Sequence, residues 1–372
     1  MNILIILTYK MSFVNWKKSG LIDRELEIYR KLQDKYNLNF TFVTFGDHND
    51  ENISIPGFKF SIIPIFKYLK KSKYLVINIC KSIYFALKIN SYCQDISVIK
   101  TNQLMGSWVG IISKFRLKAN LIVRTGYDAF EFAIRDNKSI LKKTLYYLLT
   151  QTSLIFADIY TVTSESDMKL ILKRFNTRFS RLIKVPNYVV IQNFDVKFDK
   201  RSENILSIGR LEKQKNFEEL IEGFANTDTE IDLIGSGSSE KSLKELARKC
   251  NTKVNFLGTF SNNELLSIYK NYKYYVSTSN FEGNSKTILE ALSGGCIVYV
   301  KDIPNNLEII TDKINGFLYS EKFDYEKFEI IKKYDTSTLE KISNSGVDLI
   351  KSIYSVDKLS EIEYKNYLSL KK

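Results

Sequence analysis

Short runs of apolar residues alternate with longer amphipathic segments along the first half of the chain. The runs Asn2–Leu7 and Asn39–Phe45 predict buried strands, because parallel strands covered on both faces carry nearly continuous apolar residues. Between them, Ile22–Tyr36 places apolar residues at helical spacing. The same patterns predict strands at Ile96–Lys100, Leu121–Arg124 and Ile159–Val162, and helices at Ser107–Phe115, Ile140–Phe156 and Glu165–Phe175.

The second half repeats this alternation after polar residues and a proline interrupt it between Pro186 and Ser202. Strands are predicted at Ile205–Ile208, Ile231–Ile234, Val254–Leu257, Tyr274–Ser277 and Cys296–Tyr299, and helices at Phe217–Phe224, Ser239–Lys249, Asn263–Lys270 and Ser285–Ser293. Strands that alternate with helices indicate parallel sheets wrapped on both faces. We therefore expect two doubly wound, Rossmann-like α/β domains that face each other across a cleft, residues 1–190 and 191–354, followed by a terminal helix in 355–372.

The positive charge is confined to the first half of the chain. Of 372 residues with a net charge of +13, residues 1–190 contain 29 Lys and Arg against 14 Asp and Glu, whereas residues 191–372 contain 26 against 28. Residues 52–94 contain seven lysines among many aromatic and aliphatic residues, and no acid. This pattern suits an anionic membrane surface, although a solvated helix face in a lysine-rich protein is an equally simple interpretation. No nucleic-acid-binding motif is present, so a nucleic-acid partner is not expected.

The inventory of metal ligands is poor, and no targeting segment is visible. The four cysteines, at 80, 93, 250 and 296, form no CxxC pair, and His48 is the single histidine. A zinc site is therefore not expected, and scattered thiols are typical of a reducing cytoplasm. No apolar stretch approaches the ~20 residues that span a bilayer. We expect a cytoplasmic chain, or one that is peripheral at the inner face of the membrane.

The segment 205–216 combines a strand end with two fixed cations. A predicted strand runs into Gly209-Arg210, and Lys215 follows five residues later, before the next helix. An arginine presents a planar fork of donors to phosphate oxygens, and a lysine presents a point charge. This arrangement favours an anion-binding site, although a basic surface loop would look the same.

Two carboxylates flank the start of the predicted helix Ser285–Ser293. Glu282 precedes the helix, and Glu290 stands eight positions later, about two helical turns on. The amides around Gly283, Asn284 and Ser285 can receive phosphate oxygens at the helix start. One carboxylate would therefore lie beside a bound anion and the other further along the ligand, where carboxylates accept hydrogen bonds from sugar hydroxyls.

These segments resemble glycosyltransferase family 4, the retaining glycosyltransferases of GT-B fold. The resemblance covers residues 205–318 in order and spacing. It rests on Gly209-Arg210-Leu211 with Lys215-Asn216, Gly235-Ser236-Gly237, Glu282 with Glu290-Ala291-Leu292-Ser293-Gly294-Gly295, and Glu308-Ile309-Ile310 with Asn315-Gly316-Phe317-Leu318.

The resemblance implies roles for residues of the second domain. Arg210 and Lys215 would bind the donor diphosphate and offset the charge of the leaving nucleotide, and Glu282 would contact the transferred sugar. The donor-binding residues would be Gly209, Phe260 near the base, Gly283, Asn284 and Ser285 at the phosphate, and Glu290 at the ribose. The family needs no metal ion and no cofactor, since the nucleotide sugar is a substrate.

The first half resembles the family less closely. Gly20 ends Trp16-Lys17-Lys18-Ser19-Gly20, which stands before the first predicted helix where many members have a glycine-rich loop. Asn187 belongs to a Pro-Asn element, and the stretch around Arg124, Tyr127 and Asp128 lacks the histidine that many members place near the transferred sugar. These five residues are the candidates for the acceptor side. In the resembling fold, the terminal helix packs back on the first domain.

The resemblance thus implies a hexosyltransferase that moves a sugar from a nucleotide sugar to an acceptor with retention of configuration. A bacterial surface glycan, such as a lipopolysaccharide, a capsule or a lipid-linked oligosaccharide, would suit the basic acceptor domain. Two alternatives share the fold: a sugar-nucleotide epimerase, and a non-catalytic protein that only binds nucleotide sugars. The absent histidine gives some weight to the second alternative.

Overall fold

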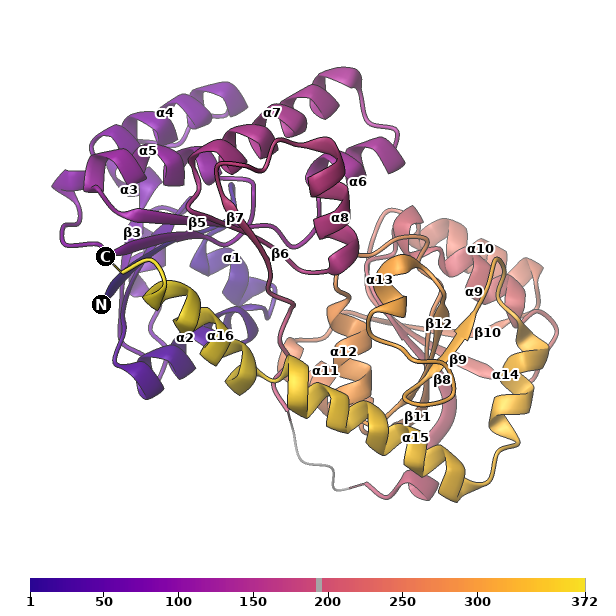
Figure 1. Ribbon diagram of the computed structural model, residues 1–372. Helices are drawn as coiled ribbons and strands as arrows, with labels where there is room; N and C mark the ends of the chain where they lie inside the picture. Colours follow the sequence, from indigo (N-terminus) through magenta and orange to yellow (C-terminus); the bar gives the residue numbers. More distant parts are fainter. Residues whose placement is uncertain (192–195, 372) are drawn as a thin grey trace. The chain divides into compact units, whose positions relative to one another are not determined.

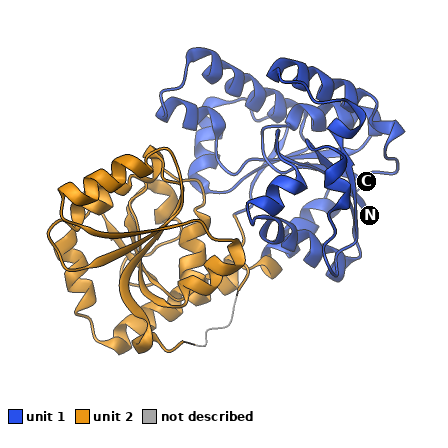
Figure 2. Cartoon of the chain, turned by 180° about the vertical axis from the view of Figure 1, so that it is seen from behind, with its two compact units in different colours: residues 1–186, 359–372 blue, residues 187–358 orange. Residues whose placement is uncertain are grey.

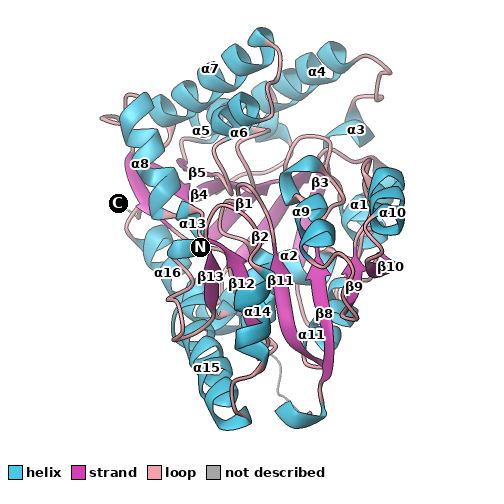
Figure 3. Cartoon of the chain, turned by 90° about the vertical axis from the view of Figure 1, so that its right-hand side faces the viewer, coloured by secondary structure: helices cyan, strands magenta, loops and turns pink. Residues whose placement is uncertain are grey.

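The computed structural model describes residues 1–191 and 196–371, and the chain divides into two compact units (Figure 2). Unit 1 comprises Met1–Pro186 and Leu359–Lys372, and unit 2 comprises Asn187–Lys358. Each unit is a parallel β-sheet with helices on both faces (Figure 3). The predicted pair of doubly wound, Rossmann-like α/β folds is therefore confirmed. Residues 192–195, within the predicted boundary region, lie outside the described residues.

The sheet of unit 1 has the order β3-β2-β1-β4-β5-β6-β7 in the described residues, and all neighbouring strands are parallel. The strands are β1 (Asn2–Ile6), β2 (Asn39–Thr44), β3 (Phe60–Pro64), β4 (Val98–Thr101), β5 (Asn120–Arg124), β6 (Ile159–Val162) and β7 (Arg181–Lys184). The order reverses between β1 and β4. The sequence pattern missed β3 and β7 because both are edge strands and neither carries the continuous apolar run of a central strand.

Three helices, α4 (Leu75–Leu87), α5 (Ser107–Leu117) and α7 (Ile140–Phe156), cover one face of the unit 1 sheet (Figure 1). The middle helix, α5, contacts both others: its Trp108 Nε1 donates to Ser82 Oγ of α4 at 2.9 Å, and its Ser107 Oγ lies 2.9 Å from Ser153 Oγ of α7. Beneath them, Leu4 and Ile6 of β1 join the apolar core. The remaining short helices of the unit are α1 (Phe13–Lys18), α3 (Ile65–Tyr68), α6 (Ala129–Arg135) and α8 (Glu165–Arg174).

The opposite face of unit 1 carries α2 (Ile22–Tyr36) and the last helix, α16 (Val356–Leu368). The Tyr36 and Tyr364 rings stack with their centroids 3.8 Å apart, and Lys35 Nζ lies 2.7 Å from Glu361 Oε1. A buried ion pair joins Lys100 of β4 to Glu363 of α16. Hence α16 is held to the sheet of unit 1 by both packing and charge.

One local difference concerns the segment that ends at Gly20. The helix α1 begins after Ser12, whose side chain accepts from the amide of Asn15, and it includes Trp16. Because such a serine cap stabilises the first turn, this segment is helical up to Lys18 where a loop was expected. Gly20 follows with φ +65°, a conformation that favours glycine.

The sheet of unit 2 has the order β10-β9-β8-β11-β12-β13 in the described residues. Its strands are β8 (Ser202–Ile208), β9 (Glu230–Ile234), β10 (Lys253–Gly258), β11 (Tyr272–Ser277), β12 (Ile297–Lys301) and β13 (Phe317–Tyr319). Its helices are α9 (Phe217–Gly223), α10 (Glu240–Lys249), α11 (Asn262–Tyr269), α12 (Lys286–Ser293), α13 (Pro304–Leu307), α14 (Tyr325–Lys332) and α15 (Thr336–Leu349). Neighbouring residues of β8 enter different cores: Ile205 packs in the cluster that contains α9, and Leu206 in the cluster that contains α12.

Candidate functional site

The candidate site of unit 2 lies at the carboxyl ends of the adjacent strands β9, β8 and β11. The strand order reverses between β8 and β11, and doubly wound folds bind ligands at such a switch point. Residues 209–216 follow β8 and residues 278–285 follow β11. The two cationic residues and the first carboxylate of the predicted site therefore leave the sheet side by side.

Two glycines after β9 allow its loop to approach the turn after β8. A Cβ on Gly235, whose φ is +150°, would lie 1.8 Å from the Gly209 carbonyl oxygen, and one on Gly237 would lie 2.4 Å from the Leu211 carbonyl oxygen. The amides of Gly209 and Leu211 donate to Ile234 and Ser236 at 2.9 Å. The Gly-Ser-Gly loop thus fixes the turn that carries Arg210.

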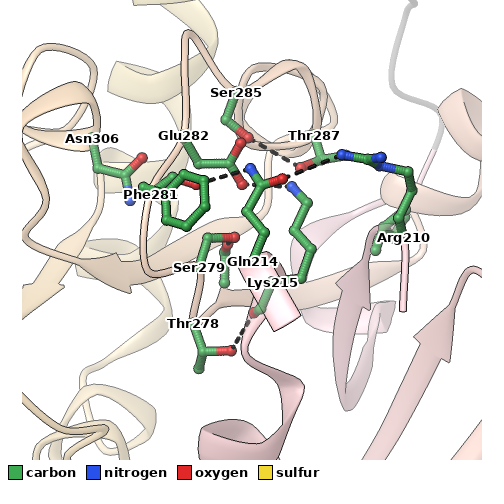
Figure 4. A network of polar contacts seen from close by, with 12 residues as sticks. Arg210, Gln214, Lys215, Thr278, Ser279, Phe281, Glu282, Ser285, Thr287 and Asn306 are labelled. Carbon is green, nitrogen blue, oxygen red and sulfur yellow. Dashed lines mark hydrogen bonds and ion pairs between the residues drawn. The ribbon is translucent and has the colours of Figure 1, made fainter. Parts of the chain in front are cut away.

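A buried ion pair forms the centre of the site (Figure 4). Lys215 Nζ lies 2.5 Å from Glu282 Oε1, and the two side chains are 13% and 8% exposed. Gly209 leaves room for the lysine stem, since a Cβ there would meet the Lys215 side chain at 3.1 Å. The structure therefore brings together two of the three predicted catalytic residues, which are 67 positions apart.

Two residues that the sequence did not single out connect the two loops. Gln214 Nε2 donates to the Phe281 carbonyl at 2.9 Å, and Gln214 Oε1 accepts from Arg210 Nη2 at 3.2 Å. Thr278 Oγ1 donates to the Asn216 carbonyl at 2.8 Å. The signal that was available for Gln214 was its place between the two predicted cations.

The start of α12 lies beside the ion pair. Ser285 precedes the first turn, which contains no acidic residue, and its side chain makes no hydrogen bond to the helix amides. Instead, Ser285 Oγ lies 3.3 Å from Thr287 Oγ1. The loop before the helix is fixed by Asn284, whose side-chain and main-chain oxygens accept from the Asn187 amide at 2.8 Å and from Asn187 Nδ2 at 2.5 Å. A helix start with these properties favours a bound anion.

Glu290 lies within unit 2 and is 3% exposed. Asn262 Nδ2 donates to one carboxylate oxygen at 3.3 Å, and the Tyr269 hydroxyl donates to the other at 3.2 Å. Burial, together with the charge of Glu290, raises the pKa of Tyr269 well above its usual range, so the hydroxyl stays protonated as a donor. These partners fix the orientation of the carboxylate.

Two further predicted residues lie at the surface of unit 2. Arg210 is exposed, and its guanidinium contacts Gln214. Phe260 follows β10 and is 36% exposed, although an apolar ring gains from being covered. Among the described residues, no group of three or more His, Cys, Asp or Glu side chains is arranged to hold a metal ion.

The acceptor-side candidates occupy different environments. Arg124 ends β5, and Tyr127 is exposed with its ring against Phe132. Asp128 is buried as the N-cap of α6, where its Oδ1 accepts from the Glu131 amide. Burial raises the pKa of Asp128 to about 6. Asn187, by contrast, lies in unit 2 with Asn284.

The two Rossmann-like units give the chain the fold class of the GT-B glycosyltransferases. Sucrose-phosphate synthase from Thermosynechococcus elongatus matches it with a TM-score of 0.79, over 100% of this chain and 99% of that chain, at 15% identity. The family model of glycosyl transferases group 1 matches residues 191–332. This segment, which contains the whole Gly209–Glu290 site, is therefore a glycosyl transferases group 1 domain.

Curated relatives are named as glycosyltransferases. An N-acetylgalactosamine-N,N'-diacetylbacillosaminyl-diphospho-undecaprenol 4-alpha-N-acetylgalactosaminyltransferase from Campylobacter jejuni is 24% identical over 309 residues, 80% of this chain and 78% of the relative. The GtfA subunit of a UDP-N-acetylglucosamine–peptide N-acetylglucosaminyltransferase from Streptococcus agalactiae is 29% identical over 126 residues, 32% of this chain. The chain spans a quarter of the length of that second protein and less than half of its Streptococcus parasanguinis counterpart.

Proposed function

We propose that the protein is a retaining glycosyltransferase of family 4 that transfers a hexose-type sugar from a nucleotide donor to an acceptor. The observation that carries the proposal is the Lys215–Glu282 pair beside the start of α12, at the switch point of a glycosyl transferases group 1 domain. A cation, a carboxylate and a helix start meet there. Together they match a ligand that carries both phosphate charge and sugar hydroxyls.

In this proposal, Lys215 and Arg210 bind the donor diphosphate. The bond between the anomeric carbon and the diphosphate oxygen breaks, so negative charge grows on the leaving nucleotide, where fixed cations stabilise the transition state. The acceptor hydroxyl forms the new bond, and its proton leaves with the diphosphate. Glu282, held by Lys215, faces the sugar hydroxyls and the positive charge that develops on the ring.

The remaining donor contacts follow along α12. The amides of Gly283, Asn284 and Ser285 receive phosphate oxygens, and Glu290 accepts hydrogen bonds from the ribose. Gly209 allows the close approach of the loop, and Phe260 covers the base. Because the two cations offset the diphosphate charge, we propose that transfer needs no metal ion, and equal rates with and without EDTA test this.

The acceptor is proposed to be a glycan or a lipid-linked glycan of a bacterial cell surface. The Campylobacter relative is named for a diphospho-undecaprenol-linked acceptor, and unit 1 carries the positive charge of the chain. Arg124, Tyr127 and Gly20 are the proposed acceptor contacts, with Asp128 positioning the start of α6. Four free cysteines are consistent with work in the cytoplasm, at the inner face of the membrane.

The test measures both donor binding and turnover. Melting temperatures are recorded with UDP, GDP, ADP and CMP for the native chain, for Glu290→Gln and for the control Glu245→Gln, whose side chain is exposed. A nucleotide at about 100 times its Kd adds ~2.7 kcal/mol of stability. We expect one nucleotide to stabilise the native chain and the control but not Glu290→Gln, and its hexose derivative to be turned over with retention. Binding without any turnover would identify a non-catalytic nucleotide-sugar-binding protein instead, and epimerised donor would identify an epimerase.

A further inference from the structure

An apolar stripe runs along the exposed side of α7. Leu141, Leu145 and Leu148 are 68%, 56% and 53% exposed, and their spacing of four and three residues places them on one face of the helix. Ile155 continues the same face one further step along. A surface helix ordinarily buries its apolar face and exposes its polar one, and α7 does the reverse.

A second stripe runs along α4. Ile77, Tyr84 and Leu87 are exposed along this helix, and Tyr74 and Val76 extend the exposed apolar surface at its start. Figures 1 and 3 both show α4 and α7 as outer helices on the same side of unit 1. Between them, Phe115 of α5 is 60% exposed and its ring contacts Phe156 of α7 at 5.6 Å. The two stripes and Phe115 form one surface, which we name the α4–α7 face.

Positive charge surrounds this face. Residues 52–94, which contain α4, include seven lysines and no acid, and residues 137–157, which contain α7, include three lysines and no acid. Lys73 Nζ lies 5.1 Å from the centre of the Tyr74 ring. Lysines beside exposed tyrosine and leucine side chains are the composition of surfaces that lie in the headgroup region of anionic bilayers.

Scattered surface apolarity, a membrane-spanning helix and a protein partner each account less well for the face. Single exposed apolar residues are common, but two helical stripes on neighbouring helices exceed that background. In the part of the chain that the structure describes, no helix is long and apolar enough to cross a membrane. A protein partner would explain the apolar side chains, but the absence of acids over both segments favours a partner that is uniformly negative.

We propose that the α4–α7 face docks on an anionic lipid bilayer, with its leucine, isoleucine and tyrosine side chains in the interface and its lysines at the headgroups. Unit 1 is thereby held at the membrane by a surface other than the Gly209–Glu290 site. The consequence that a lipid-linked acceptor is met at this membrane rests on the proposed function. The docking itself does not.

The experiment is flotation of the full chain with vesicles of phosphatidylcholine and phosphatidylglycerol at 3:1, against vesicles of phosphatidylcholine alone, in 50 and 500 mM salt. We expect strong flotation with the anionic vesicles in low salt and a weaker, residual fraction in high salt, because salt screens the lysines and leaves the apolar contacts. Leu145→Glu/Leu148→Glu and Val76→Glu are expected to reduce the bound fraction at least tenfold. Lys73→Gln/Lys142→Gln is expected to weaken binding about fivefold for each lysine removed.

The matched control is Leu172→Glu/Ile330→Glu, which changes equally exposed residues of α8 and α14 outside the face. Equal flotation of the control and the face variants would overturn the proposal, as would the absence of native flotation in low salt. If the native chain elutes as a dimer and Leu145→Glu/Leu148→Glu as a monomer, with no vesicle binding by either, the face joins two copies instead. Donor turnover, measured without lipid on the same preparations, separates a failure of docking from a failure of the proposed function.

Discussion

Replacing Lys215 by methionine removes one charge of the central ion pair while keeping the side-chain stem. Glu282 would then be a carboxylate that is 8% exposed and has lost its partner at 2.5 Å. Removal of one partner from a buried pair costs 3–5 kcal/mol, and the partial exposure of Lys215 favours the lower end, about 3 kcal/mol. With 2–4 °C per kcal/mol for a unit of this size, the melting temperature of Lys215→Met should fall by about 6–12 °C.

The same variant should also bind the nucleotide more weakly. A hydrogen bond to a charged group contributes about 1.5–3 kcal/mol, which corresponds to roughly 10- to 150-fold in Kd. The double variant Lys215→Met/Glu282→Gln separates the two effects, because it leaves no unpaired charge. It should recover most of the lost melting temperature and none of the lost affinity.

The assay pairs thermal melting with calorimetric titration of UDP, and the control is Lys213→Met. Lys213 is exposed and lies in the same turn, two residues before Lys215, so a general loss of positive charge would affect both variants alike. Unchanged stability of Lys215→Met would refute the ion pair as a stabilising contact. Recovery of UDP affinity in the double variant would refute the direct role of the Lys215 ammonium, since the loss would then come from distortion around Glu282.

Three further predictions concern other parts of the molecule. Glu290→Gln should weaken UDP binding at least tenfold in titration calorimetry while the melting temperature of the nucleotide-free protein changes by only a few degrees, because an amide keeps the partners Asn262 and Tyr269; unchanged affinity would contradict a ribose contact. Gly235→Ala should destabilise unit 2 by several kcal/mol and abolish UDP binding, because its Cβ would lie 1.8 Å from the Gly209 carbonyl, whereas Gly57→Ala, with φ +73° and nothing within 4 Å, should cost only the backbone strain of about 1 kcal/mol. Burial raises the pKa of Asp128 to about 6, so the folded state binds more protons than the unfolded state between about pH 4 and 6, and stability falls as the pH rises through that window. Asp128→Asn should therefore raise the melting temperature at pH 8, by up to about 3 kcal/mol of stability, and much less at pH 4; an equal gain at both pH values would contradict this account.

The central strands could be predicted because each is a run of apolar residues between helices of clear periodicity. The prediction for Ile159–Val162 agrees with β6 in both ends, and those for Ile22–Tyr36 and Ile140–Phe156 agree with α2 and α7. The edge strands and short helices could not be predicted. An edge strand is buried on fewer sides, and a helix such as α13 (Pro304–Leu307) has too few residues to show a period.

The candidate site was predictable in its residue types but not in its contacts. Arg210, Lys215, Glu282 and Glu290 could be selected because cations after a strand and carboxylates around a helix start have a chemical meaning of their own. Their partners could not be selected, because each contact depends on which strands are neighbours. The contact of Gln214 with Phe281 requires β8 to lie beside β11, although β9 and β10 separate them in sequence.

The α4–α7 face shows the opposite limit of sequence reasoning. Ile140–Phe156 is apolar around most of its circumference, and such a helix is expected to be buried on all sides. In the structure Leu154 is fully buried against the sheet side of unit 1, whereas Leu141, Leu145 and Leu148 face outward because α7 is an outer element. Only the fold reveals which half of the helix is left exposed. An exposed stripe of this kind costs solubility unless something covers it, and the lysines that flank it make an anionic bilayer the partner that satisfies both the apolar and the charged side chains at once.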